Sequence, residues 1–433
     1  MFARIKQIFD RQNRDILKKI LFTFAALFVF KIGTVVAVPG VEEDLDMGFL
    51  ELLNIMGGGA MENFSIFALG VMPYITASII MQLLQMDIIP YFSELSKQGQ
   101  TGRNKLNQIT RIFGIVLAFI QGYMFSFAYV KGGEVIDYLQ FSLVLTAGTC
   151  FLLWLGDQIT QKGFGNGISM IIMAGILAST PYMFSEAWGA LVDTANTQSM
   201  FLGVLTFIIF VLIYLAIIIG VIFVQLAERR IPIQYANQTS AAYGGKQTSS
   251  GYNKQNAYLP FKLNSAGVIP VIFASALVSV PALIAQLAKN EDMMLFVNKW
   301  LSLTSGTGFI LFLLLIIAFS YFYTFVQIKP KEMAENLQQR GGYIPGIKPG
   351  EETTNYVSKV LVRITVVGSL FLAAIAGLPY IFSMFSNMPT SVTIGGTGLL
   401  IVVGVVLESY KQLDSALISR SYKPGSRRQR GHR

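Results

Sequence analysis

The chain has 433 residues, of which 53% are hydrophobic and 13% are charged, and its net charge is +9. Because soluble proteins carry about a quarter of charged residues, this composition excludes an ordinary soluble domain and indicates a membrane protein with several spans. The single cysteine, Cys150, excludes a disulfide framework. The single histidine, His432, lies in a basic tail. This excludes histidine-based acid–base catalysis and a zinc site of the usual His or Cys kind.

The N-terminal segment 1–19 is basic, and the apolar stretch 20–38 follows it. The basic segment is long and no small-x-small cleavage pattern follows the apolar stretch, so we expect a retained first span rather than a signal peptide. Lys31 is the only charge well inside a predicted span. Snorkelling of its ammonium towards an interface explains it better than a functional role, which stays open.

Residues 57–85 read GGGAMENFSIFALGVMPYITASIIMQLLQ. The first half is rich in glycine and too polar for a membrane helix, whereas the second half is apolar. Gly70 and Pro73 lie in the middle, where a helix is kinked or broken. The stretch therefore predicts two pieces rather than one continuous span.

Ten apolar runs are candidates to cross the roughly 30 Å hydrocarbon core as helices. An even number of spans places both termini on one side, and that side carries 29 of the 33 Lys and Arg residues. Acidic residues divide evenly between the two sides, so the bias is specific to Lys and Arg and predicts cytoplasmic termini. The predicted spans are 20–38, 70–86, 112–130, 141–159, 167–185, 202–225, 266–287, 307–326, 360–379 and 393–412.

The predicted fold class is an all-α polytopic membrane protein with two sets of five spans. An odd number of spans per set makes the second set enter from the opposite face, so an inverted repeat is possible. The predicted organisation is a cytoplasmic segment 1–19, a first half 20–185, a second half 186–412 and a basic cytoplasmic tail 413–433.

Two long cytoplasmic segments, 226–265 and 327–359, separate spans of the second half. In the first, Ile231, Ile233 and Tyr235 alternate and Gly244–Gly245 supplies a turn, so a two-stranded ribbon is expected. The second is rich in Gly and Pro and indicates an ordered, protruding loop. Both exceed ordinary loop lengths and are basic, so docking of an acidic or nucleic-acid partner is as well supported as a solvated connector.

The membrane interior lacks the carboxylates and histidines that ion-coupled transporters carry at mid-membrane. Asp157, Glu228 and Glu408 fall at or near cytoplasmic span ends. Asp157 follows a glycine in WLGD, but no second membrane aspartate completes a protease dyad. A passive channel is therefore favoured over a secondary transporter with inverted repeats, and an intramembrane enzyme is disfavoured further.

Small polar side chains gather in two spans. Such side chains either join packed helices by hydrogen bonds or line a seam between helices that can open towards water. Composition does not distinguish these two roles. The side chains are Thr76, Ser78 and Gln82 in the second span, and Asn264, Ser265 and Ser275 around the seventh.

Seven stretches, spread in order over nearly the whole length, are FSIFALGVMPYITASIIMQLL (64–84), WLGDQIT (154–160), GFGNGIS (163–169), RRIPIQYA (229–236), PFKLNSAGVIPVIFASAL (260–277), ENLQQRGGYIPGIKPGEET (335–353) and GGTGLLIVVGVVLE (395–408). Together they resemble the SecY family, which forms the large subunit of the bacterial protein-conducting channel. The resemblance implies two halves, spans one to five and six to ten, that form a clamshell around an hourglass pore. Its function would be to move unfolded polypeptides across the membrane and to release apolar segments sideways into lipid.

The resemblance also implies an aliphatic ring at the pore waist, and a narrow apolar constriction stops ions by dewetting. Taken alone, each of these side chains would be read as ordinary packing. The matched ring positions are Val71, Ile75, Ile168, Ile172, Ile272 and Ile401.

A short plug on the outer side of the ring is implied at 57–67. The glycines allow a hinge, and apolar residues at helical spacing would rest on the waist. The plug residues are Gly57, Gly58, Gly59, Met61, Phe64 and Ile66. A lateral gate is implied between spans two and seven, with Thr76, Gln82 and Asn264 at its polar positions.

The chain has no P-loop, so the resemblance implies an external energy source, either the SecA motor ATPase or a translating ribosome. Arg229, Arg230 and Lys348 lie in the two loops that would dock them. The family usually has arginine where Lys348 stands, and lysine keeps the charge but lacks the planar fork.

Other partners implied are the small membrane subunits SecE and SecG, signal peptides, unfolded preproteins and the lipid bilayer. The implied location is the bacterial cytoplasmic membrane, with both termini in the cytoplasm. No catalytic residue, cofactor or metal is expected.

Overall fold

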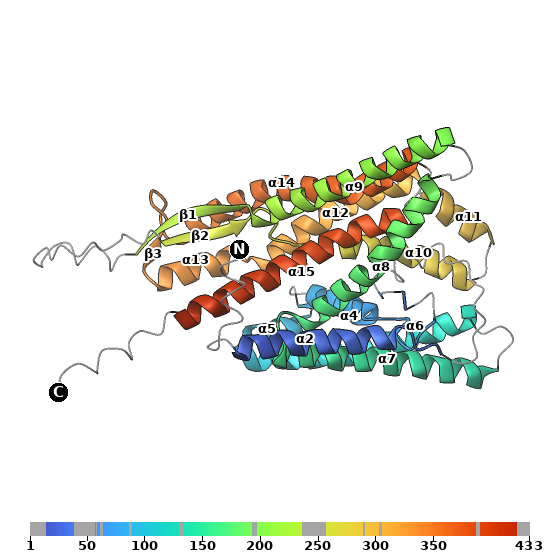
Figure 1. The fold of residues 1–433 in the computed structure, drawn as a ribbon. Helices are drawn as coiled ribbons and strands as arrows, with labels where there is room; N and C mark the ends of the chain where they lie inside the picture. Colours follow the sequence, from blue (N-terminus) through green and yellow to red (C-terminus); the bar gives the residue numbers. More distant parts are fainter. Residues whose placement is uncertain are drawn as a thin grey trace, which may run out of the picture. The chain divides into compact units, whose positions relative to one another are not determined.

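The computed structural model describes residues 14–38, 57, 59–60, 64–85, 89–129, 134–192, 197–235, 257–288, 291–302, 305–386 and 390–421. Nearly all of them are helical, and one small sheet lies at the end of the long helices (Figure 1). The helices are α2 (Arg14–Gly33), α4 (Met72–Leu84), α5 (Pro90–Lys97), α6 (Gly99–Tyr129), α7 (Val135–Lys162), α8 (Gly167–Leu191), α9 (Thr197–Leu226), α10 (Ile269–Ala288), α11 (Glu291–Trp300), α12 (Gly306–Gln327), α13 (Pro330–Gln339), α14 (Glu351–Ser386) and α15 (Thr390–Ser421). The strands are β1 (Glu228–Tyr235), β2 (Ala257–Lys262) and β3 (Gly342–Tyr343).

Each of the ten predicted spans overlaps a helix, and the prediction of a helical membrane protein is confirmed. Six helices, α6, α7, α8, α9, α12 and α14, contain stretches long and apolar enough to cross a membrane. Some predicted ends were wrong. The first span was predicted to continue to residue 38, but α2 ends at Gly33, which places Lys31 in its last turn rather than well inside a span.

The helix of the second span is shorter than the membrane core is thick. Helix α4 has 13 residues, which at 1.5 Å per residue reach only about 20 Å of the roughly 30 Å hydrocarbon core. It starts late because Gly70 has φ +55°, in the left-handed region, and because Pro73 fits only the first turn of a helix. Residues 64–71 form turns instead, so the predicted break is confirmed.

The chain divides into two compact units, one of residues 1–186 with 401–433 and the other of residues 187–400. In the first unit, α6 packs against both α4 and α7, and α2 packs against α7. The backbones of α6 and α7 approach closely where a Cβ on Gly122 would lie 3.3 Å from Ser142. There the Ser142 hydroxyl donates to the Phe119 carbonyl at 2.8 Å, which joins the two helices.

In the second unit, α12 packs against α10 and α14. The sheet has the order β2-β1-β3, and β1 is antiparallel to both neighbours, with Ile231 opposite Leu259 and Gln234 opposite Tyr343. The two-stranded ribbon of the first loop is therefore confirmed, and Gly244–Gly245 lies outside the described residues. The second loop is ordered, as predicted, and contributes α13 and β3.

The sheet shares an apolar core with α14. Ile231 and Phe261 of the sheet pack with Val357 and Leu361 of α14, and all four are at most 2% exposed. Ile344, just after β3, completes this cluster from the second loop. The described parts of segments 226–265 and 327–359 and the start of α14 are consequently one packed body.

Candidate functional site

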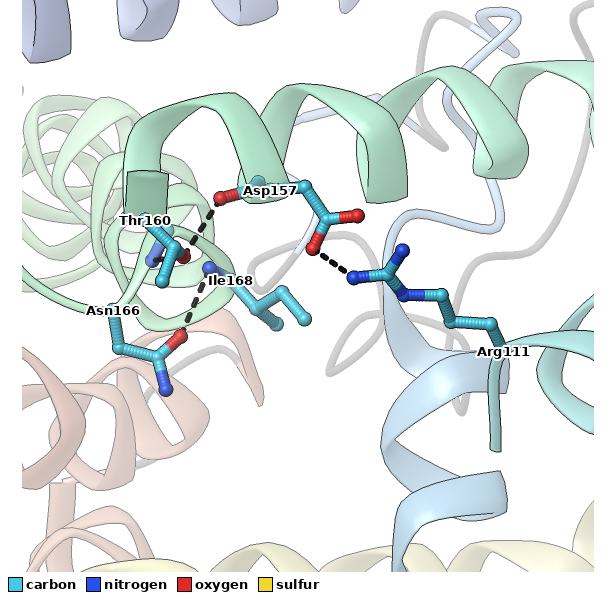
Figure 2. Close-up of polar contacts among 7 residues, drawn as sticks. Arg111, Asp157, Thr160, Asn166 and Ile168 are labelled. Carbon is cyan, nitrogen blue, oxygen red and sulfur yellow. Dashed lines mark hydrogen bonds and ion pairs between the residues drawn. The ribbon is translucent and has the colours of Figure 1, made fainter. Parts of the chain in front are cut away.

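The turn from α7 to α8 brings two backbones into contact (Figure 2). A Cβ on Gly167 would collide with the carbonyl of Gly156, so position 167 leaves no room for a side chain, and a Cβ on Gly156 would lie 3.1 Å from the Ile168 side chain. The Thr160 hydroxyl donates to the Gly156 carbonyl and accepts from the Gly167 amide, both at 2.9 Å. Asn166 Oδ1 accepts from the Ile168 amide at 3.2 Å and thereby caps the start of α8.

This corner also fixes neighbouring helices of the first unit. The Thr23 hydroxyl of α2 accepts from the Phe164 amide at 2.9 Å. A Cβ on Gly165 would lie 3.1 Å from Ser409 Oγ of α15. Gly165 has φ +83°, which other residues adopt only with strain. The motifs WLGDQIT and GFGNGIS therefore build a rigid joint among α2, α7, α8 and α15.

The predicted ring residues are described individually. Val71 forms the N-cap of α4, and Ile75 lies one turn further along that helix. Ile168 and Ile172 lie one turn apart on α8, directly after the rigid joint. Val71, Ile172 and Ile401 are buried, and Ile75, Ile168 and Ile272 are half-buried. Ile272 belongs to the second unit and the other five to the first, so a closed ring of six stays a prediction.

The segment before α4 is anchored to α2 and α7. The Ile66 amide donates to the Val36 carbonyl at 3.0 Å, and the Val38 amide donates to the Phe64 carbonyl at 2.9 Å. A short β-bridge joins Ala37 to Ser65 between these two bonds. This part of the predicted plug is thus held to the chain that follows α2.

Aromatic packing continues the anchor. The Phe67 ring is 3% exposed and stacks between Phe30 of α2 and Phe151 of α7, with centroid distances of 6.3 and 5.8 Å. Gly33 and Gly148 leave no room for a Cβ beside Phe67 and the Ile66 carbonyl.

Two predicted plug residues, Gly58 and Met61, lie outside the described residues. Gly57 is buried, and Gly59 has φ +82°. Phe64 and Ile66 belong to the anchored part. A plug that moves as one piece over 57–67 would have to break that anchor, so any mobile part would end before Phe64.

The predicted gate residues satisfy most of their polar groups locally. The Thr76 hydroxyl donates to the Met72 carbonyl at 3.1 Å, within α4. The Asn264 amide is 8% exposed and donates to the Gly267 carbonyl at 2.9 Å, in the turn before α10. Gln82 Oε1 is buried and accepts no hydrogen bond from the part of the chain that the structure describes. Burying a carbonyl oxygen without a hydrogen bond costs free energy, so a donor that reached Gln82 Oε1 would be bound favourably.

The predicted docking residues are all exposed. Arg230 is engaged, because its guanidinium pairs with Glu228 at 2.6 Å and lies 4.8 Å from the Tyr258 ring centroid. The hydrogen bond with Glu228 raises the pKa of Arg230. Lys348 is presented on a fixed backbone, since its carbonyl accepts from the Thr353 hydroxyl at 2.9 Å. Arg229 and Lys348 thus present their charges from ordered segments.

The sequence reasoning missed one polar contact. Asp157, expected above only to lie at or near a span end, pairs with Arg111 at 2.5 Å and so joins α7 to α6 (Figure 2). Arg111 was predicted to lie at the same side of the membrane as Asp157. Two opposite charges predicted at the same membrane surface are the signal that could have suggested this ion pair. Among the described residues, no cluster of His, Cys, Asp and Glu could hold a metal ion.

The chain is similar to known proteins over almost its full length. A family model described as SecY matches residues 65–410. The protein translocase subunit SecY of Staphylococcus epidermidis is 48% identical over 98% of this chain and 99% of its own length. The same subunit of Bacillus subtilis is 48% identical over 94% of this chain and 96% of its own.

Solved structures with the same fold include a protein-conducting channel, with a TM-score of 0.63 and 17% identity over 95% of both chains. Sec61 in the canine ribosome–channel complex from the endoplasmic reticulum has a TM-score of 0.60 and 16% identity, again over 95% of both chains. At these identities the likeness concerns the fold.

Proposed function

The chain belongs to the SecY family, and from that premise we propose that it forms the protein-conducting pore of a translocase. Unfolded polypeptides would cross the membrane through it, and signal peptides and other apolar segments would leave it sideways into lipid. Its role is that of a channel, not of an enzyme. This membership also decides against a secondary transporter.

The broken second span is the observation that carries the proposal. Helix α4 is too short to cross the membrane, so its start lies within the bilayer. Val71 and Ile75 stand at that start, where a pore would be narrowest. Ile172 and Ile401 would complete the constriction from the same unit, and Ile272 from the other.

The constriction would be sealed by its apolar side chains. Branched aliphatic groups exclude water from a narrow passage, so no charged gate is needed to stop ions. They also bind no particular side chain of a passing polypeptide. A plug formed by residues before Phe64 would cover the ring, with Phe64–Phe67 as its fixed base.

The lateral gate would use Gln82 and Asn264. The first backbone amides of a helical signal peptide have no partner within that helix. One of them could donate a hydrogen bond to Gln82 Oε1. A run of ten leucine-like residues gains roughly 3–6 kcal/mol on entering lipid, which biases its exit without an energy source.

Movement of polar chains would need a partner. SecA or a translating ribosome would dock on Arg229 and Lys348, and the ribosome-bound relative of the same fold supports the second of these. SecE and SecG would complete the membrane complex. The excess of Lys and Arg on one side supports termini in the cytoplasm. The bacterial relatives support a bacterial cytoplasmic membrane.

Reconstitution tests the proposal. The chain is purified with its small membrane subunits and placed in vesicles with SecA, ATP and a secretory preprotein. We expect the preprotein to become protected from added protease. Failure of protection, when the Bacillus subtilis relative succeeds in the same vesicles, would refute the proposed function.

Planar bilayers test the ring separately. The triple change Ile75→Ser, Ile172→Ser, Ile401→Ser should let the resting channel conduct ions, because hydroxyl groups wet the constriction. Ile219→Ser, on an exposed face of α9, is the control. Equal conductance of the triple variant and the control would show that these residues do not line the constriction.

A further inference from the structure

Helix α11 exposes an apolar stripe although it lies outside the predicted spans. Phe296 and Trp300, one turn apart, are 58% and 48% exposed, and Leu295 is 68% exposed. Val297 alone among these is buried, at 4% exposure, and attaches the helix to its unit. Large apolar side chains exposed together on one short helix are typical of a surface that binds a membrane or another protein.

A rigid corner fixes the direction of this helix. The Thr307 hydroxyl donates to the Trp300 carbonyl at 3.0 Å, and the Ser302 amide donates to the Val297 carbonyl at 2.9 Å. The Gly308 amide donates to Ser305 Oγ at 3.1 Å, and a Cβ on Gly308 would collide with the carbonyl of Ser302. The exposure of the stripe therefore belongs to an ordered element joined to the start of α12.

The position of α11 identifies what covers it. Within its unit, α11 contacts α10 and α12 at the end away from β1 and β2 (Figure 1). The first turns of α12 expose Ile310 and Leu314, at 59% and 58%, on a helix long enough to cross a membrane. In a spanning helix such side chains face lipid, and α11 is in contact with this helix.

The chemistry of the stripe fits the boundary between lipid and water. Trp and Lys gather at membrane interfaces, where the ring is partly in lipid and the ammonium reaches water. Lys299 Nζ lies 6.0 Å from the Trp300 ring centroid, and Asn298 is exposed on the opposite side of the helix. Asp292 lies one turn before Phe296, at the edge of the stripe. Short helices with this division of side chains lie in the plane of the interface.

We propose that α11 is an interfacial membrane anchor, with Phe296 and Trp300 inserted into the lipid at the bilayer surface. It ties the adjoining end of α10, the helix that carries Ile272, to the membrane surface. If the orientation proposed above holds, this is the outer leaflet; insertion itself does not depend on the orientation or on channel activity.

Tryptophan fluorescence tests the anchor. In the complex carrying Trp154→Phe and Trp188→Phe, Trp300 is the only tryptophan of this chain; signals from partner subunits are subtracted with a Trp300→Phe sample. The complex is reconstituted into phosphatidylcholine–phosphatidylglycerol vesicles brominated either near the headgroup or near the chain end. We expect shallow bromines to quench Trp300 about twofold more than deep ones, as for a ring at the interface.

A pair of charge variants completes the test. Phe296→Asp should reduce the quenching and shift the emission towards that of tryptophan in water, whereas Asn298→Asp, on the polar side, should change neither. Emission like that in water with no quenching would overturn the proposal. Blue-shifted emission without quenching would also overturn it, because a protein partner would then cover the stripe. Protease protection of a preprotein, measured on the same vesicles, reports the channel function independently.

Discussion

Replacing Phe67 with alanine tests whether the segment before α4 is anchored as the structure indicates. Phe67 is 3% exposed and stacks against two rings, one from α2 and one from α7. Burial in a membrane protein gains little transfer energy, because lipid is as apolar as the protein interior. The loss comes instead from the cavity and from the ring contacts.

The magnitude follows from these two terms. Removing a phenyl ring leaves roughly 100 Å³, which costs about 2.4 kcal/mol at about 24 cal/mol per Å³. Each lost ring pair adds about 0.5–1.5 kcal/mol. The total is about 3–5 kcal/mol, and at the lower end this lowers the Tm of a unit of about 200 residues by about 6–12 °C.

The assay is thermal unfolding of the purified complex in detergent, followed by loss of monodisperse protein. The matched control is Phe24→Ala, because Phe24 lies on α2, the helix that supplies Phe30, but is 67% exposed. We expect the Phe67 variant to unfold well below the control and to conduct ions at rest, since the base of the plug is loosened. Equal Tm values for the two variants would refute the anchor.

Three further outcomes are expected. Arg111→Ala and Asp157→Ala should each destabilise the complex by at most about 1 kcal/mol, since both side chains are partly exposed, and a double-mutant cycle in thermal unfolding should give a nonzero coupling. Gly167→Ala should cost about 3 kcal/mol, measured as lost folded yield, because its Cβ meets a backbone carbonyl that cannot yield; a normal yield would contradict the close crossing. Lys348→Glu should slow SecA-driven export several-fold while Lys331→Glu, on α13, has a smaller effect; equal rates would separate Lys348 from docking.

The spans could be predicted because each apolar run carries its own signal. The break before α4 was visible too, since Gly70 and Pro73 disfavour a continuous helix whatever surrounds them. Short helices such as α5 and α11 were missed because they lack the length of a span. Their apolar residues become informative only when the neighbouring helices are in place.

Contacts between distant segments could not be predicted. Nothing local to Phe67 indicates that Phe30 and Phe151 enclose it, and the pairing of Arg111 with Asp157 depends on how α6 and α7 pack. The strand β3 is only two residues long and forms because β1 offers it partners. Motif resemblance suggested the ring and gate residues, which stay predictions, and their local hydrogen bonds depend on the fold.

The core shared by the sheet and α14 couples the two mechanically, so that they move together. Helix α14 has 36 residues, about 54 Å of continuous helix, with its only internal proline, Pro379, near the far end. Val357 and Leu361 of α14 are packed against Ile231 and Phe261 of the sheet. A force on the sheet therefore displaces helix α14 as a whole instead of bending a loop. A load applied to the sheet is therefore carried along α14, and Pro379 is a point near its far end where the helix can bend.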